Sequence, residues 1–244
     1  HRLPVNDVHI SNCSFSSVCA AIRIGLKSIG SISDVHISHC SMKNVWREGI
    51  KIECSEGGNI SDINIQDITM NDVSRPIFIL LNNRFEPDDL GSSLELDHIP
   101  EIGTMSDIII SDIIASDSDE MRNTHYRFDD DVMGSPKFAG IRIDAEKNHP
   151  IRNLTLRNIS YKFIGGVKLS DIPNENPEVI DKLIDCDTLS SENYYPDWSR
   201  ASFMDIRNII GLNVRNIQCF AIYPDERRGI ITENVQFSDN SDNL

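Results

Sequence analysis

The chain has 244 residues, of which 39% are hydrophobic and 25% are charged, and its formal net charge is −15. This apolar fraction suffices for the packed core of one domain, whereas the negative charge argues against binding to nucleic acid, whose phosphates attract Lys and Arg. The sequence has no run of about 20 apolar residues and no close CxxC pair among its six cysteines, so we expect no membrane span, no metal site and no cofactor.

A seven-residue motif that alternates apolar and polar side chains recurs along the chain. The copies are 7–13, 34–40, 62–68, 107–113, 153–159 and 211–217, with steps of 27, 28, 45, 46 and 58 residues. Such alternation is typical of a half-buried strand, and a repeat of this kind buries its apolar side only by stacking on its neighbours. The sequence therefore predicts an all-β fold, a right-handed parallel β-helix, with inserted loops or extra coils at the longer steps.

The sixth position of each copy predicts one corner of the coil, because short polar side chains favour turns and tolerate left-handed backbone. These residues are Asn12, His39, Asp67, Asp112, Asn158 and Asn216. Cys13 and Cys40 follow this corner in successive copies, and we interpret them as small buried hydrophobes rather than as a disulfide. His36 and His39 project to opposite sides of a strand, which is poor geometry for a shared metal.

A second strand is predicted at 21–24, 49–52, 76–79 and 140–143. Its isoleucines should point inward; they are Ile22, Ile24, Ile50, Ile52, Ile77 and Ile79. The residues between them, Arg23, Lys51, Phe78 and Arg142, should point outward on one sheet. Helical signals are weak throughout, and the prolines within 171–200 indicate an irregular insertion. Residues 1–244 otherwise form a single domain in this interpretation.

Several of these segments resemble the polygalacturonases, the pectin-degrading enzymes of glycoside hydrolase family 28. That family carries N-V-x-I-x-N-C-x-F, G-H-G-I-x-I-G, G-I-R-I-K and an I-T-M rung, which correspond here to 7–15, 19–25, 49–53 and 65–79. The ending at 224–235 is also similar. The resemblance implies hydrolysis of glycosidic bonds in pectin or a related acidic polysaccharide, a polysaccharide or oligosaccharide partner, and a secreted or periplasmic location.

The departures from the family pattern concern the catalytic groups. The family's catalytic aspartates lie upstream of the G-H-G motif, and the histidine of that motif corresponds to Ala20 in this chain. The Arg and Lys of the family's R-I-K motif correspond to Lys51 and Glu53. We therefore expect the C-terminal portion of a longer β-helix, whose aspartates lie on a missing N-terminal segment or a second chain. We identify no pair of carboxyl groups at coil spacing on the outward sheet, so this chain alone should be inactive.

Substrate contacts are expected on the outward sheet and at its edge. Arg23, Lys51 and Glu53 should share one face there and form the floor of a shallow groove open to solvent. The candidates are Arg23, Lys51, Glu53, Phe78, Asn82 and Arg84. Arg and Lys could pair with a uronate carboxylate, and Glu53 could either pair with Lys51 or do chemistry of its own. Trp46 and the aromatic residues of 194–198 could stack on sugar rings or pack loops against the coil. The alternative to an enzyme is a β-helix that binds polysaccharide without cutting it, or one that is purely structural.

Overall fold

The computed structural model describes residues 3–26, 29–83, 90–91, 97–118, 140–171, 201–239 and 241–242. Within these ranges the chain is built from β-strands, and its one helical element is the short 3-10 turn η2 (Leu169–Asp171). The same ranges hold no helix with the length and apolar character needed to cross a membrane. The all-β prediction is confirmed, whereas the predicted insertion at 171–200 lies outside the described residues from 172 onward.

The strands differ widely in length, from four residues in β1 and β2 to 23 residues in β4, β5 and β9. The strands are β1 (Val8–Ser11), β2 (Ser14–Ser17), β3 (Ile22–Leu26), β4 (Ile32–Cys54), β5 (Asn59–Leu81), β6 (Thr104–Ser116), β7 (Ile141–Ala145), β8 (Ile151–Gly165), β9 (Ala201–Tyr223) and β10 (Arg228–Phe237). All of their pairings are parallel.

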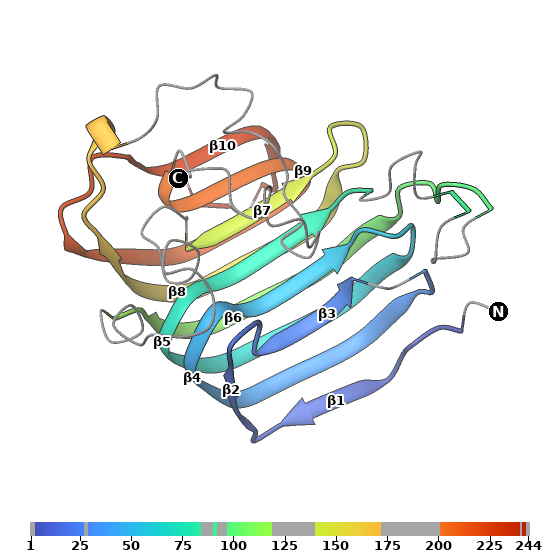
Figure 1. Ribbon diagram of the computed structural model, residues 1–244, viewed down its shortest axis with the longest axis horizontal. Coiled ribbons are helices and arrows are strands. Elements are labelled where there is room, and N and C mark those ends of the chain that lie inside the picture. Colours follow the sequence, from blue (N-terminus) through green and yellow to red (C-terminus); the bar gives the residue numbers. More distant parts are fainter. Residues whose placement is uncertain are drawn as a thin grey trace.

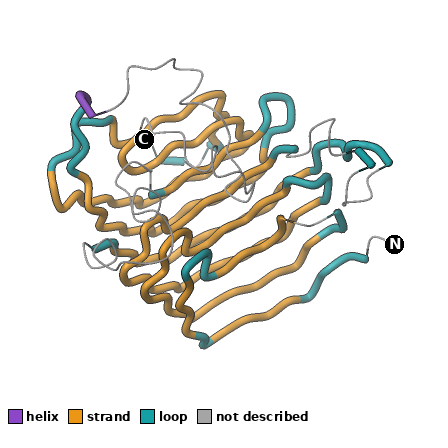
Figure 2. The backbone as a smooth tube through the Cα atoms, viewed as in Figure 1, coloured by secondary structure: helices purple, strands orange, loops and turns teal. Residues whose placement is uncertain are grey.

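Successive passes of the chain lie against each other in sequence order. β1, β2 and β3 pair in turn with the beginning, middle and end of β4, and β4 pairs along most of its length with β5. β5 pairs with β6 and then β7, and these pair with β8 and β9. Figure 1 shows the result, a stack of passes from blue β1 to red β10, and Figure 2 shows strand along most of each pass.

The motif copies found in the sequence are neighbours in register. Val8 pairs with Val35, Val35 with Ile63, Ile63 with Ile108 and Ile108 with Leu154. Thr155 then pairs with Asn213, which carries the alignment across the longest step. The prediction that all six copies stack is therefore confirmed, and the longer steps add residues between strands without shifting the register.

The predicted corner has left-handed backbone at each of its six positions, with φ between 50° and 58°. Its side chains also bond from pass to pass: Asn158 Nδ2 donates to Asp112 Oδ1 at 2.8 Å, and Asn216 Nδ2 donates to Asn158 Oδ1 at 3.0 Å. His39 lies in this corner 3.4 Å from the Asp67 carboxylate, as expected. The first residue of each motif copy forms a second left-handed corner, which the sequence analysis missed; Asp7, Asp34, Asp62, Asp107 and Asn153 have φ of 54° to 56°.

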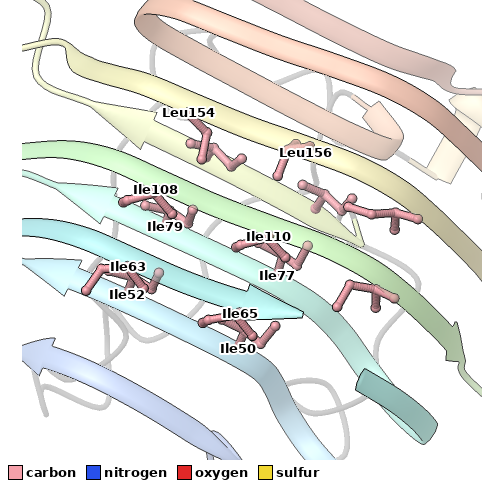
Figure 3. Packing of buried hydrophobic residues seen from close by; sticks show 14 of the residues in the cluster. Ile50, Ile52, Ile63, Ile65, Ile77, Ile79, Ile108, Ile110, Leu154 and Leu156 are labelled. Carbon is pink, nitrogen blue, oxygen red and sulfur yellow. The ribbon is translucent and has the colours of Figure 1, made fainter. Parts of the chain in front are cut away.

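The core lies inside the stacked passes. Ile22, Ile24, Ile50, Ile52, Ile77 and Ile79 are all buried in one hydrophobic cluster, as predicted. Figure 3 shows the labelled side chains in two rows, with residues from the first half of one pass beside residues from the second half of another. Cys40 is buried in this core, as predicted, whereas Cys13 is only partly buried and packs against it; both are free thiols.

Replacing Ile50 by Ala should lower the free energy of unfolding by roughly 2–5 kcal/mol, because a buried aliphatic side chain leaves a cavity that its neighbours fill only in part. Urea denaturation of the purified chain measures this change. Ile114→Ala is the matched control, because Ile114 projects outward from β6 with 66% of its surface exposed, and its loss should cost less than about 0.5 kcal/mol. Equal effects of the two changes would contradict the inward packing of Ile50.

Candidate functional site

The face of β3, β4, β5, β7 and β9 that points away from the isoleucine core carries two rows of residues. Arg23, Lys51, Phe78, Arg142 and Asp205 pair in sequence across the five strands and form the first row. The second row lies two residues further along each strand, on the same side of the pleat; it comprises Gly25, Glu53, Leu80, Asp144 and Arg207. We call these two rows the charged face.

The charged face differs from the open groove that the sequence suggested. Arg23, Lys51 and Glu53 do share one side of the sheet, but Lys51 and Glu53 are 0% exposed, and only the Arg23 side chain, at 27%, meets solvent. The prediction of a solvent-open floor is therefore wrong for Lys51 and Glu53. The physical reason is mutual pairing: the Glu53 carboxylate lies 2.7 Å from Arg23 Nη2 and 3.1 Å from Lys51 Nζ, and buried charges persist only when they are paired.

Gly25 allows β3 to approach β4 beside this ion cluster. Its φ is +94°, and a Cβ at this position would overlap the backbone oxygen of Glu53. Glycine adopts this backbone conformation readily, and it has no side chain that would displace the neighbouring strand. The glycine that follows Arg23 and Ile24 in the sequence is therefore part of what holds Arg23 against Glu53.

Phe78, a predicted substrate contact, is 4% exposed, and two cations lie near its ring. The centroid of its ring is 5.3 Å from Lys51 Nζ and 5.3 Å from Arg75 Cζ, distances at which a cation is attracted to the ring. Glu48 lies 3.7 Å from both Arg47 and Arg75. Burial by itself would raise the pKa of the Glu48 carboxyl, but Lys51, Arg47 and Arg75 together hold that pKa below its ordinary value.

The two remaining predicted contacts follow the end of β5. Asn82 is 5% exposed, its backbone N–H donates to the oxygen of Cys54 at 3.1 Å, and its side-chain Oδ1 accepts no hydrogen bond from the described residues. Arg84 lies outside the described residues, as do 129–131 and 194–198. Trp46 is buried, which leaves little of its ring for a sugar.

Four residues at the β7 and β9 end of the face form a group that the sequence analysis did not assemble. We call Arg142, Asp144, Asp205 and Arg207 the charge quartet. Arg142 Nη2 lies 3.6 Å from Asp144 Oδ2, and Arg207 donates two hydrogen bonds of 3.1 Å to the Asp205 carboxylate. A sequence signal did exist, because residues 140–144 repeat the glycine–isoleucine–cation–isoleucine–acid pattern of 49–53.

The two aspartates of the quartet have different surroundings. Burial raises the pKa of Asp144 to about 6, although Arg142 and Arg207 oppose the shift and Asp205 adds to it. Asp205 is instead bound by both nitrogens of the Arg207 fork. The charge quartet thus holds one carboxyl group whose pKa burial raises to about 6 and one that is bound in an ion pair.

Among the described residues, no group of three or more His, Cys, Asp or Glu side chains is placed to hold a metal ion. No model of a known protein family matches the sequence, and no curated protein matches it.

Replacing Asp144 by Asn should stabilise the folded chain at pH 7.5. A carboxyl whose folded pKa is raised contributes its full stability below its unfolded pKa of 3.8 and loses that contribution as the pH rises through about 6. Asn cannot ionise, so the gain should be roughly 1–3 kcal/mol, since a tenfold change in proton affinity is worth about 1.4 kcal/mol. Urea denaturation at pH 4.5 and 7.5 checks this; a variant less stable than the parent at pH 7.5 would contradict it.

Proposed function

We propose that the chain is part of a carbohydrate-active right-handed parallel β-helix, similar to the polygalacturonase-type glycoside hydrolases, that acts on a uronate-containing polysaccharide. The observation that carries this proposal is the first row of the charged face, where Arg23, Lys51 and Arg142 lie in register around Phe78. A β-helix places one such residue on every coil, so a linear polymer running across the strands would meet the exposed parts of Arg23 and Arg142. Lys51 and Phe78, which are 0% and 4% exposed, would lie beneath it.

Two general features support the β-helix. Every strand pairing is parallel, and crossovers between parallel strands of one sheet are right-handed in almost all proteins. The passes repeat in register about every 27 residues where no segment is inserted, as between Val8, Val35 and Ile63. Stacked passes of this kind resemble the coils expected from the motif spacing.

The positive charge and the planar shape of the exposed guanidinium groups favour an acidic polymer as the ligand. Arg23 keeps 27% of its side chain exposed and Arg142 keeps 12%. A guanidinium fork binds a carboxylate through two parallel hydrogen bonds. In this proposal Arg23 and Arg142 contact uronate carboxylates directly, and Lys51 contributes its charge from beneath.

A purely structural β-helix is the second candidate. The burial of Lys51 and Glu53, and their pairing at 3.1 Å, favours it, because two partnered charges without solvent contact have no need of a ligand. The two candidates differ in whether Arg23 is needed for binding or only for the ion cluster.

Arg23→Gln should weaken the binding of a galacturonate oligomer by roughly tenfold or more, because a hydrogen bond to a charged group is worth about 1.5–3 kcal/mol. Calorimetric titration of the parent and the variant measures this, and raised salt should weaken binding by the parent. Arg152→Gln is the matched control, since Arg152 is an exposed arginine of β8 outside the charged face. The affinity of the Arg152→Gln variant for the oligomer should equal that of the parent.

The same titration separates the two candidates. No heat with the parent at either salt concentration, in protein whose thermal melting shows that it is folded, would reject polysaccharide binding and favour the structural β-helix. Equal affinities for the parent and Arg23→Gln would remove the charged face from the binding site.

A further inference from the structure

We infer that His9 and His36 form a binding site for one divalent transition-metal ion of the zinc, copper and nickel class, and that Asp7 and Asp34 orient the two rings. This inference does not depend on the proposed function, because the charged face uses the end of β4, whereas this site uses β1 and the beginning of β4. It departs from the sequence-based expectation of no metal site. The sequence analysis compared His36 with His39 on the same strand, and did not consider two histidines on neighbouring strands.

The register of the first two passes places the two histidines side by side. His9 of β1 pairs with His36 of β4, at the edge of the stack where Figure 1 shows β1. Their rings are stacked, with the centroids 5.0 Å apart and the planes 11° from parallel. The His9 side chain is 66% exposed and the His36 side chain is 45% exposed. A metal ion in solution therefore reaches both rings directly.

Each ring is also held by a carboxylate from its own strand. His9 Nε2 donates to Asp7 Oδ1 at 3.1 Å, and His36 Nε2 donates to Asp34 Oδ1 at 2.9 Å. An ionised carboxylate only accepts hydrogen bonds, so the hydrogen of each neutral ring lies on Nε2 and Nδ1 keeps a lone pair. Histidine ligands of metals usually donate their other ring nitrogen in this way, which fixes the tautomer and raises the basicity of the ligating nitrogen. Asp7 and Asp34 are therefore positioning residues in this site.

The spacing of the rings suits one shared ion. Zinc binds imidazole nitrogens at about 2.0–2.1 Å, so two nitrogens on one ion are at most about 4.2 Å apart. Rings stacked at 5.0 Å reach this separation by tilting toward each other, and exposed side chains reorient readily. Imidazole suits zinc, copper and nickel, whereas magnesium and calcium prefer oxygen ligands. The pair of rings thus selects the class of ion.

Two histidines leave other coordination positions of the ion open to water. On the side of His36 away from β1, Asn64 pairs with His36, and Asn64 Oδ1 is buried and accepts no hydrogen bond from the described residues. A groove of about 650 Å³ lies there, lined in part by Asp34, His36 and Asn64. An unpaired buried acceptor is costly until something satisfies it, and water on the ion would donate to Asn64 Oδ1. The site therefore needs no third protein ligand.

Calorimetric titration of the full chain with zinc near neutral pH tests the site. His9→Gln and His36→Gln should each weaken zinc binding by roughly 100-fold or more, because loss of a ligand costs at least as much as loss of its outer-shell partner. Acidification should weaken binding by the parent, because protons compete with the metal for the ring nitrogens. Asp34→Asn should weaken binding roughly tenfold or more and alter the tautomer of His36, which the ring nitrogen shifts report in NMR spectra.

His39→Gln is the matched control. His39 is also exposed and has the Asp67 carboxylate 3.4 Å away, but Asn12 and Asp67 occupy the corner positions before and after it, so it has no histidine neighbour. Its variant should bind zinc as the parent does. A folded parent that binds no zinc, undiminished binding by His9→Gln or His36→Gln, or an equal loss in His39→Gln would each overturn the shared site. An unchanged His36 tautomer in Asp34→Asn would overturn the positioning role of Asp34. Thermal melting shows that each variant is folded.

Discussion

In-register parallel pairing is the constraint on which the rest of this structure depends. When each pass lies directly on the one before it, residues at equivalent positions become neighbours about 4.8 Å apart. Ile50 then packs on Ile77, and Ile77 on Ile141, in a row that continues through the core. The same constraint governs the corners, where Asp112, Asn158 and Asn216 bond to each other because each turns the chain at the same point of its pass. A substitution at one level is therefore felt by the levels on either side.

The outward side of the sheet obeys the same constraint but has a different energetic problem. Stacking like charges in adjacent passes is unfavourable, and the charged face avoids long rows of one sign. Phe78 separates Lys51 from Arg142 in the first row, and Asp205 follows Arg142. In the charge quartet the two acids occupy one diagonal and the two arginines the other, so every nearest neighbour has the opposite sign. Buried ion pairs seldom increase stability over an apolar alternative, so the alternation of sign is what allows these charges to remain inside the fold.

The pKa shifts of Glu48, beside the charged face, and of Asp144, on it, depend on how far nearby cations offset the burial of each carboxyl group. Glu48 is surrounded by three cations, and their attraction outweighs its burial. Asp144 has two arginines near it but also Asp205, and burial dominates. These two carboxyl groups therefore respond to pH in opposite directions: acidification should stabilise the β7 and β9 end of the sheet, through Asp144, and destabilise the region of Glu48.

The sequence by itself determined the all-β class, the stacking of the motif copies, the left-handed corner at the sixth motif position and the inward isoleucines, because strand alternation and left-handed corner residues are local properties of the chain. It also placed Arg23, Lys51 and Glu53 on one side of a sheet. It did not determine that Lys51 and Glu53 are buried, since burial depends on what covers the face. Nor did it reveal the charge quartet: Asp144 and Asp205 are 61 residues apart in the chain, and only the pairing of β7 with β9 makes them neighbours. Periodicity predicts which side of a strand a residue occupies, whereas the tertiary structure decides which residues share that side and how far solvent reaches them.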